Sequence, residues 1–321
     1  MTKRKHSSKL IDGPLQAASR SMLRGVGFSS EDFKKPLVGV ASTWSKVTPC
    51  NMHINDLAEI VEQSIDESNC KAVLFNTITV SDGISMGTEG MKYSLVSREV
   101  IADSIETVVG CLGYDGLVAI GGCDKNMPGA LIGMARLNRP SLFIYGGSIK
   151  PSHENTDYVT VCEKTGEYAK GDITEDELIR IEEISVKGPG SCGGMYTANT
   201  MSSAIDAMGR ALPYNSSNPA ISIDKLNEKE KAARIGGEIM GMMSGAALGT
   251  AVGAVLGFFS FGPIGAGVGV LAGGITGYVL GNKAGILLME FLFFVKVVVF
   301  LDGLPKLHKM LAQLLQYRKF D

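Results

Sequence analysis

Three cysteines stand in turns that lie far apart in the sequence. Cys50 precedes a helical stretch, while Cys123 and Cys192 stand in the glycine-rich turns 121–129 and 188–195. Thiolates are soft donors, so three of them from separate turns suit zinc or an iron-sulfur cluster with one iron open to substrate. No CxxC pair occurs, so the spacing does not indicate a structural zinc site. The pattern predicts a soft-metal centre assembled from distant loops.

Hard oxygen donors accompany these thiols. Asp124 follows Cys123 directly, and Asp82 ends another apolar run, so both carboxylates are appropriate ligands for Mg²⁺. Lys125 has two interpretations: a salt bridge with the carboxylates, which the residues alone favour, or a neutral amine that adds CO₂ and becomes an anionic carbamate ligand. A soft centre and a hard cation together would bind a hydroxy acid and activate its hydroxyl as a leaving group, which predicts dehydration chemistry.

Apolar, β-branched runs alternate with helical patterns along the first part of the chain. Short strands are predicted at 36–41, 71–80, 117–120 and 141–146, and helices at 54–68, 97–112, 130–137 and 197–211. Residues 14–35 are expected to form a helix that carries Arg20 and Arg24 and then a polar loop. The polar excursion 151–183 is expected to carry one helix, 174–184, which Thr174 and Glu177 open as a capping box. This alternation predicts an α/β fold, a mostly parallel sheet with flanking helices, and it places Cys50, Asp82 and Cys123 at one edge.

Composition limits the class of protein. The 321 residues carry a formal net charge of -2, with 20% charged and 45% hydrophobic residues, which is compatible with a globular core. A nucleic-acid surface would normally show a basic excess, so no nucleic-acid partner is expected. The six cysteines are expected to be reduced thiols in a cytoplasmic protein.

Several segments of the chain resemble the family of dihydroxy-acid and phosphogluconate dehydratases. The similarity runs from about Arg20 to Pro219, with the motifs in the order of the family, and the details favour the dihydroxy-acid branch. The segments that carry it are Thr48-Pro49-Cys50-Asn51, Ser81-Asp82-Gly83 with Met91-Lys92-Tyr93-Ser94, Ser97-Arg98-Glu99-Val100 continuing to Ser104, Gly122-Cys123-Asp124-Lys125 with Pro128-Gly129, and Gly190-Ser191-Cys192-Gly193 continuing to Met201.

The resemblance implies a hydro-lyase that removes water from 2,3-dihydroxy-3-methyl acids, giving the 2-oxo acids of valine and isoleucine biosynthesis. It implies that Cys50, Cys123 and Cys192 hold the iron-sulfur cluster, 2Fe-2S or else 4Fe-4S. It also implies that Asp82, Asp124 and a carbamylated Lys125 bind Mg²⁺, which reverses the preference for a salt bridge. The family further suggests a homodimer acting on a small dihydroxy acid.

Other residues of interest are expected to be structural. Cys70, Cys111 and Cys162 match no ligand motif and should be small structural thiols, and His53 should begin a helix. Arg98 and Glu99 stand in a family motif but are assigned to structure rather than to substrate contact.

Members of the family continue into a second domain, which supplies a further Mg²⁺ carboxylate and the serine base. Nothing here corresponds to it, so no catalytic base is assigned in this chain. The predicted organisation is an α/β domain over 1–222, a charged linker over 223–238 and a hydrophobic helical tail over 239–321. Activity of such a chain should be impaired.

The tail has the composition of a membrane hairpin. No charged residue occurs between Glu238 and Lys283, and glycine recurs at every fourth position over 241–257 and 265–285. Such a stripe lets helices pack closely in lipid, so spans are predicted at 239–261, 264–280 and 286–301, the last less securely because it contains Glu290 and Lys296. A transmembrane helix and membrane association through 239–301 are therefore expected, with a soluble glycine-rich helical pair as the alternative.

A dehydratase-like front part joined to a hydrophobic tail has three possible origins: a truncated or frameshifted product, a misassembled gene model, or a true fusion. The sequence favours the first two. Two further functions stay open. The chain could act on sugar acids of the phosphogluconate type, or it could be a non-catalytic, membrane-associated glycine-zipper protein that carries a dehydratase remnant.

Overall fold

The computed structural model describes residues 4–152, 154–222 and 225. These residues belong to the first of two compact units, 1–241 and 242–321. The predicted linker, apart from Lys225, and the predicted tail with its three spans therefore lie outside the described residues. In the described part of the chain, no helix combines the length and the apolar character needed to cross a bilayer.

A four-stranded parallel sheet forms the centre of the described residues. Its strands are β1 (Leu37–Ser42), β2 (Lys71–Asn76), β3 (Gly116–Gly121) and β4 (Ser141–Tyr145), in the order β2-β1-β3-β4. Ala41 pairs with Phe75 of β2 on one side and with Ala119 of β3 on the other. The two central strands are buried along their whole length, as their near-continuous apolar sequences require. The predicted fold of this part is confirmed, although the second strand ends at Asn76 rather than at residue 80.

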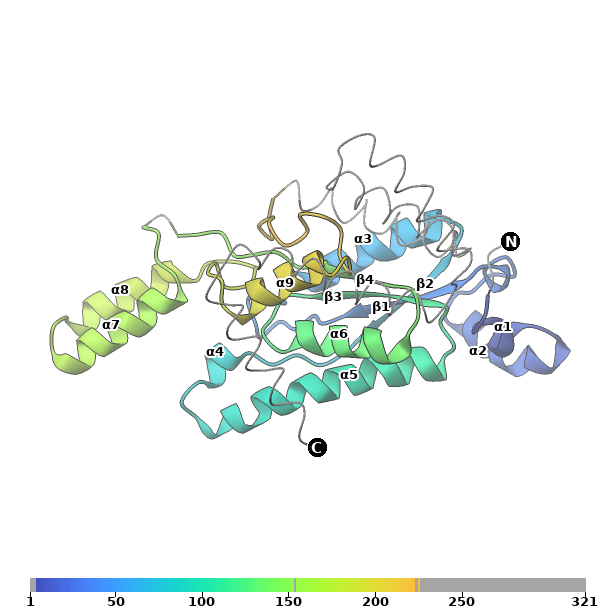
Figure 1. Cartoon of the computed structure of the whole chain (residues 1–321), viewed down its shortest axis with the longest axis horizontal. Helices are drawn as coiled ribbons and strands as arrows, with labels where there is room; N and C mark the ends of the chain where they lie inside the picture. Colours follow the sequence, from blue (N-terminus) through green and yellow to red (C-terminus); the bar gives the residue numbers. More distant parts are fainter. Residues whose placement is uncertain (1–3, 153, 223–224, 226–321) are drawn as a thin grey trace, which may run out of the picture. The chain divides into compact units, whose positions relative to one another are not determined.

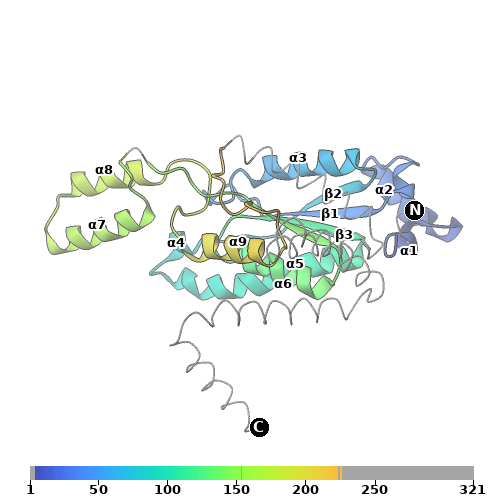
Figure 2. The same cartoon turned by 45° about the horizontal axis from the view of Figure 1, so that its top comes forward.

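Helices cover both faces of the sheet, as Figures 1 and 2 show. The helices are α1 (Ser8–Ile11), α2 (Ala17–Gly25), α3 (Ile54–Glu67), α4 (Asp82–Ser85), α5 (Ser94–Cys111), α6 (Asn126–Leu137), α7 (Tyr158–Lys170), α8 (Glu175–Ser185) and α9 (Thr197–Ala207). Short 3₁₀ turns occur at Pro14–Gln16, Asp32–Lys34 and Glu89–Tyr93. The predicted helix of the segment 14–35 is α2, and the chain leaves it through Gly27, whose φ is 97°.

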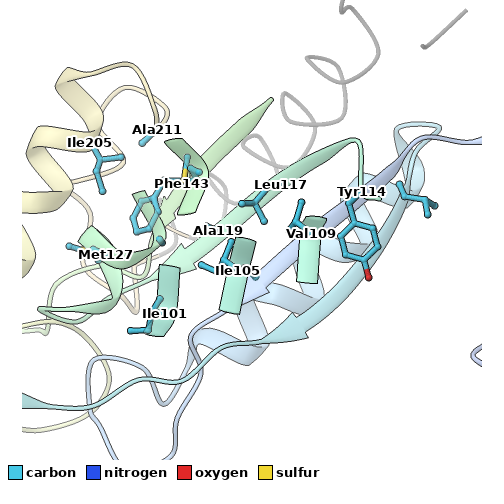
Figure 3. Close-up of a cluster of buried hydrophobic side chains, with 14 of the residues drawn as sticks. Ile101, Ile105, Val109, Tyr114, Leu117, Ala119, Met127, Phe143, Ile205 and Ala211 are labelled. Atoms are coloured by element: carbon cyan, nitrogen blue, oxygen red, sulfur yellow. The ribbon is translucent and has the colours of Figure 1, made fainter. Parts of the chain in front are cut away.

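Side chains that alternate along each strand build two separate cores. One face packs on α3, through Val38, Val40, Val118, Ile120 and Ile144 against Ile54, Leu57, Val61 and Ile65. The other face packs on α5, α6 and α9; Figure 3 shows Leu117, Ala119 and Phe143 facing Ile101, Ile105, Val109, Met127 and Ile205. Because successive strand residues point to opposite faces, one strand sequence serves both layers.

Helices α5 and α6 approach each other closely through glycine. A Cβ on Gly129 would lie 2.8 Å from the Arg98 carbonyl oxygen and 3.0 Å from Ile101 Cβ. Only glycine fits such an approach, so the turn that leads into α6 is pressed against α5. This packing holds the first turn of α6, which follows the Cys123 loop, in a defined place.

The segment between residues 151 and 183 was expected to contain one helix and contains two. The additional helix, α7, begins at the capping box of Asp157 and Thr160 and ends at Gly171, whose φ is 81°. None of its residues is buried, so α7 does not pack an apolar face into the core. At α8 Thr174 accepts from the Glu177 amide as expected. Figures 1 and 2 show the α7–α8 hairpin extending away from the sheet.

Candidate active site

The carboxyl ends of the strands gather the chemically interesting residues. Cys50 lies in the loop after β1, Asp82 begins α4 after β2, and Cys123 follows β3 by two residues. A bridge between Ser148 and Ser191 brings the Cys192 turn alongside the segment that follows β4. Parallel strands present their carboxyl ends at one edge, so the predicted convergence of these loops is confirmed.

Backbone contacts bind the three cysteine loops to one another. A Cβ on Gly122 would lie 2.5 Å from the Cys50 carbonyl oxygen, so only glycine permits this approach. The Ser191 hydroxyl donates to the Gly122 carbonyl, and the Gly190 amide donates to the Pro49 carbonyl at 3.0 Å. Each loop therefore touches the other two, and the thiols are held in one neighbourhood.

The thiols themselves interact. Hydrogen bonding between the two side chains raises the pKa of Cys50 and lowers the pKa of Cys123. Burial raises the pKa of Cys192, and the charge of Cys123 adds to that shift. Cys123 is 4% exposed, whereas Cys50 and Cys192 are half-buried. The three thiols are therefore close enough for Cys123 to influence the protonation of Cys50 and of Cys192.

Lys125 lies between two carboxylates. Its Nζ donates to Asp82 Oδ2 and to Asp124 Oδ2. Burial lowers the pKa of Lys125, but its hydrogen bonds to Asp124 and Asp82 and their charges outweigh burial and raise it. Burial likewise raises the pKa of Asp124, and its hydrogen bonds, including those with Lys125 and Thr197, reverse the effect and lower it. The salt bridge that the residues favoured is the arrangement in this structure.

One carboxylate oxygen of this group has no protein partner. Asp82 Oδ1 is buried and accepts no hydrogen bond from the described residues. A buried oxygen anion without a donor is costly, so the atom suits a ligand from outside the chain. Among the described residues, no group of three or more His, Cys, Asp or Glu side chains is placed so that it could hold a metal ion. The predicted ligand sets therefore stay predictions.

Sequence reasoning missed a group of buried asparagines that shape these loops. Asn51 Nδ2 donates to the Thr43 carbonyl at 2.8 Å, which closes the Cys50 loop. Asn126 Oδ1 accepts from the amides of Gly122 and Cys123 at 3.2 and 3.0 Å. These side-chain amides fold the loops through short-range hydrogen bonds of the Asx type. The signal available in the sequence was an asparagine within three residues of each of these two cysteines.

An asparagine side chain also folds the third cysteine loop, but it lies further along the chain from its cysteine. Asn199, seven residues after Cys192, donates to the Cys192 carbonyl at 2.6 Å and to the Gly194 carbonyl at 2.5 Å. Its Oδ1 accepts from the Tyr145 hydroxyl at the end of β4. The Cys192 turn is therefore tied to the sheet as well as to itself.

The remaining predicted residues divide into two groups. Cys70 is 1% exposed and packs in the α3 core, as expected, whereas Cys111 and Cys162 are exposed, so the expectation of buried structural thiols is wrong for them. Both stand on helices whose solvent-facing positions leave the thiol uncovered. His53 precedes α3 as expected, and its Nε2 bonds the Gly146 carbonyl at 2.9 Å.

Arg98 and Glu99 contribute to helix packing. Their side chains form an ion pair at 2.9 Å, and Glu99 also accepts from Arg136 of α6 at 3.1 Å. The pairing joins α5 to α6, in agreement with the structural assignment of these residues.

The fold and the site define an α/β protein with a candidate metal-dependent centre at the carboxyl edge of a parallel sheet. The family description "Dihydroxy-acid/6-phosphogluconate dehydratase N-terminal" matches residues 35–252. The chain belongs to this family. The match covers more than half of the chain and includes all six proposed ligand residues.

Curated relatives extend the comparison. "Dihydroxy-acid dehydratase" of Ruthia magnifica subsp. Calyptogena magnifica is 63% identical over 231 residues, covering 72% of this chain and 41% of the relative. The protein of the same name from Chromohalobacter salexigens is 61% identical, covering 72% and 40%. That of Vesicomyosocius okutanii subsp. Calyptogena okutanii is 64% identical, covering 70% and 41%. The chain thus matches about two fifths of the length of these relatives.

Proposed function

We propose that this chain is the site-bearing portion of a dihydroxy-acid dehydratase. The reaction removes the C2 proton and the C3 hydroxyl of a 2,3-dihydroxy-3-methyl acid as water, and the resulting enol tautomerises to the 2-oxo acid. The observation that carries the proposal is the convergence of three cysteine loops and the Asp82–Lys125–Asp124 group at one sheet edge. The names of relatives that are 61 to 64% identical support it.

The donor sets fit the cofactors that the family resemblance implies. Cys50, Cys123 and Cys192 would hold the iron-sulfur cluster, 2Fe-2S or else 4Fe-4S, because their sulfurs cluster and their loops contact one another. Asp82 and Asp124 would hold Mg²⁺, since Asp82 Oδ1 is buried without a protein partner. When bound, the two centres supply Lewis acidity that makes the substrate hydroxyl a better leaving group.

Lys125 is proposed to become the third oxygen ligand as a carbamate. The neutral amine nitrogen attacks the carbon of CO₂, an electron pair of one C=O bond moves to oxygen, and the nitrogen loses a proton to solvent. In this structure Asp82 and Asp124 stabilise the protonated ammonium and raise the pKa of Lys125, which opposes the step. Carbamate formation at this lysine should therefore require a divalent cation that takes over the charge of the ammonium.

The chain's own residues have defined tasks in this proposal. The asparagine-folded loops keep the thiols together, and the Asp82 and Asp124 carboxylates offer oxygen ligands to a cation. No base is assigned to the described residues. The prediction that this stretch of sequence turns over slowly without the family's second domain therefore remains untested, as do the homodimer and the cytoplasmic location with membrane association through 239–301.

A chimera tests the function. Residues 1–222 of this chain replace the matching portion of the Chromohalobacter salexigens relative, and the purified hybrid is reconstituted anaerobically with iron and sulfide. We expect dehydration of 2,3-dihydroxy-3-methylbutanoate, lost when Cys123 is changed to Ser. The unaltered relative is the positive control. A folded hybrid that loads the cluster yet does not dehydrate this acid contradicts the proposal.

The same hybrid separates the alternatives. The family description also names 6-phosphogluconate dehydratase, so preferential turnover of a sugar acid would favour that branch. For the membrane-associated alternative, the full 321-residue chain is fractionated. Recovery in the membrane pellet without visible cluster absorbance would favour a non-catalytic protein, and a brown protein in the supernatant would favour the dehydratase.

A further inference from the structure

Tyr158 joins the α7–α8 hairpin to the turn that carries Asp82. Its hydroxyl donates to the Gly83 carbonyl at 3.1 Å and lies 3.8 Å from Met86 Sδ. Its ring atoms lie 3.5 to 3.7 Å from the place that a Cβ on Gly83 would occupy. Figures 1 and 2 show the hairpin leaving the rest of the described residues on the side where α4 lies. The tyrosine thus covers the turn with both its ring and its hydroxyl.

The position of Tyr158 is itself defined. It is the first residue of α7, directly after the helix cap. The Asp157 carboxylate accepts from the Thr160 amide at 3.0 Å, and the Asp157 amide donates to the Thr160 hydroxyl at 3.2 Å. Because this reciprocal box holds the first turn, the tyrosine approaches α4 from a fixed base.

The Asp82 turn has little support of its own. α4 is a single turn with no buried residue, and Ile84 and Met86 are 62% and 55% exposed. The amides of Ile84 and Ser85 bond only the neighbouring Ser81 carbonyl, at 3.2 and 3.4 Å. From outside the turn, Lys125 holds it through the carboxylate of Asp82, and Thr88 donates from its amide and its hydroxyl to the Ser85 carbonyl at 3.1 and 2.7 Å. An isolated turn of this kind depends on such contacts to keep its place.

The contact made by Lys125 depends on charge. Resting on the proposed function, carbamylation would convert the +1 ammonium of Lys125 into a −1 group, so the direct ion pair between Lys125 and Asp82 would be lost and Asp82 would face the cation instead. The contact made by Tyr158 joins a neutral hydroxyl to a neutral carbonyl, and no charge on Lys125 alters it. The contacts made by Lys125 and by Tyr158 therefore respond differently to the same modification.

We propose that Tyr158 is a positioning residue that keeps the Asp82 turn in place when Lys125 no longer carries an ammonium charge. Its hydroxyl fixes the backbone of Gly83, so Asp82 stays directed at the cation site. Tyr158 does not touch the reacting atoms in this proposal; it acts through Asp82.

The test compares Tyr158→Phe with Tyr168→Phe in the full 321-residue chain. Tyr168 stands on the same helix and is 43% exposed, so its variant is the matched control. Millisecond hydrogen exchange reports on the amides of residues 83–86, and α5 amides serve as the folding reference. Binding of Mn²⁺ alone, in bicarbonate buffer, is followed by electron paramagnetic resonance of the free ion.

Loss of the neutral hydrogen bond from Tyr158 to the Gly83 carbonyl predicts exchange at residues 83–86 faster by about threefold to tenfold, with Mn²⁺ affinity weaker by a similar factor. Tyr168→Phe should change neither. Unchanged exchange in Tyr158→Phe overturns the proposal. Faster exchange with unchanged Mn²⁺ affinity overturns the positioning role and leaves Tyr158 as a packing contact.

Failure of the proposed function is distinguishable. If the unaltered chain takes up no Mn²⁺, the metal site is refuted. The contact between Tyr158 and Gly83 is then tested by hydrogen exchange in a Lys125→Gln variant, where the ammonium is absent. There Tyr158→Phe should accelerate exchange by more than it does beside the native lysine. An equal or smaller effect in that background overturns the inference.

Discussion

Replacing Asn126 with alanine should loosen the turn that carries Cys123, Asp124 and Lys125. The Asn126 side chain is fully buried, and its Oδ1 accepts from the amides of Gly122 and Cys123 at 3.2 and 3.0 Å. Its Nδ2 donates to the Thr79 hydroxyl at 2.8 Å. A methyl group replaces none of these contacts, so Asn126→Ala leaves two backbone donors buried without their acceptor.

The size of the effect follows from these contacts. An unsatisfied buried donor costs about 1–3 kcal/mol, and Gly122 and Cys123 are both buried. We therefore expect the free energy of unfolding to fall by about 3 kcal/mol. With a urea dependence of about 2 kcal/mol per molar, typical of small domains, the urea midpoint should fall by about 1.5 M.

The assay is urea unfolding of the reduced, metal-free chain, followed by far-ultraviolet circular dichroism. Asn55→Ala is the matched control, because Asn55 lies on α3 and bonds only the exposed Glu59 side chain, at 3.0 Å. Its free energy of unfolding should change by less than about 0.5 kcal/mol. Iron uptake on anaerobic reconstitution provides a second measurement, and it should be lower for Asn126→Ala alone.

The refuting result is specific. If Asn126→Ala and Asn55→Ala unfold at the same urea concentration, the side-chain amide does not hold the turn. The argument that asparagines shape the cysteine loops would then fail at its most buried example.

Two further predictions concern packing and pH. Gly122→Ala places a Cβ 2.5 Å from the Cys50 carbonyl oxygen, so urea unfolding should show a chain that is less stable by about 1–3 kcal/mol. The control is Gly110→Ala, on α5 with open space around it, which should be neutral or stabilising. Burial raises the pKa of the Cys70 thiol from 9.0 to about 11, so the folded state favours the protonated thiol. The contribution of this thiol to the free energy of unfolding is therefore complete below pH 9 and falls as the pH rises toward 11. Between pH 9 and 10, before Tyr114 with its pKa of about 12 titrates, the unaltered chain should lose about 1 kcal/mol more stability than Cys70→Ala loses, and equal pH profiles for both proteins would contradict this.

Local sequence was sufficient to place much of the site. Apolar, β-branched runs that end in turns predicted the parallel sheet, and a residue just after a strand must lie at its carboxyl edge. This geometry alone put Asp82 and Cys123 near each other. The tail pattern of residues 239–301 stays a prediction of the same kind, because it rests on spacing in the sequence.

Other features depend on residues that are distant in the chain. Whether a cysteine is buried depends on what packs over it, so the sequence could not show that Cys111 and Cys162 are exposed. The contact of Tyr158 with Gly83 joins positions 75 residues apart, and no local pattern encodes it. The helix α7 was missed because its stability does not come from a buried face.

The sequence by itself determined where the strands end, because strand ends depend on contacts between near neighbours. It also determined the family, because the family is defined by residue types in a fixed order. Only the tertiary structure decided that the Gly122 backbone lies against Cys50, that Lys125 joins Asp82 to Asp124, and that buried amides fold the loops. The physical reason is that hydrogen bonds and close packing between distant segments form only when the sheet brings those segments together.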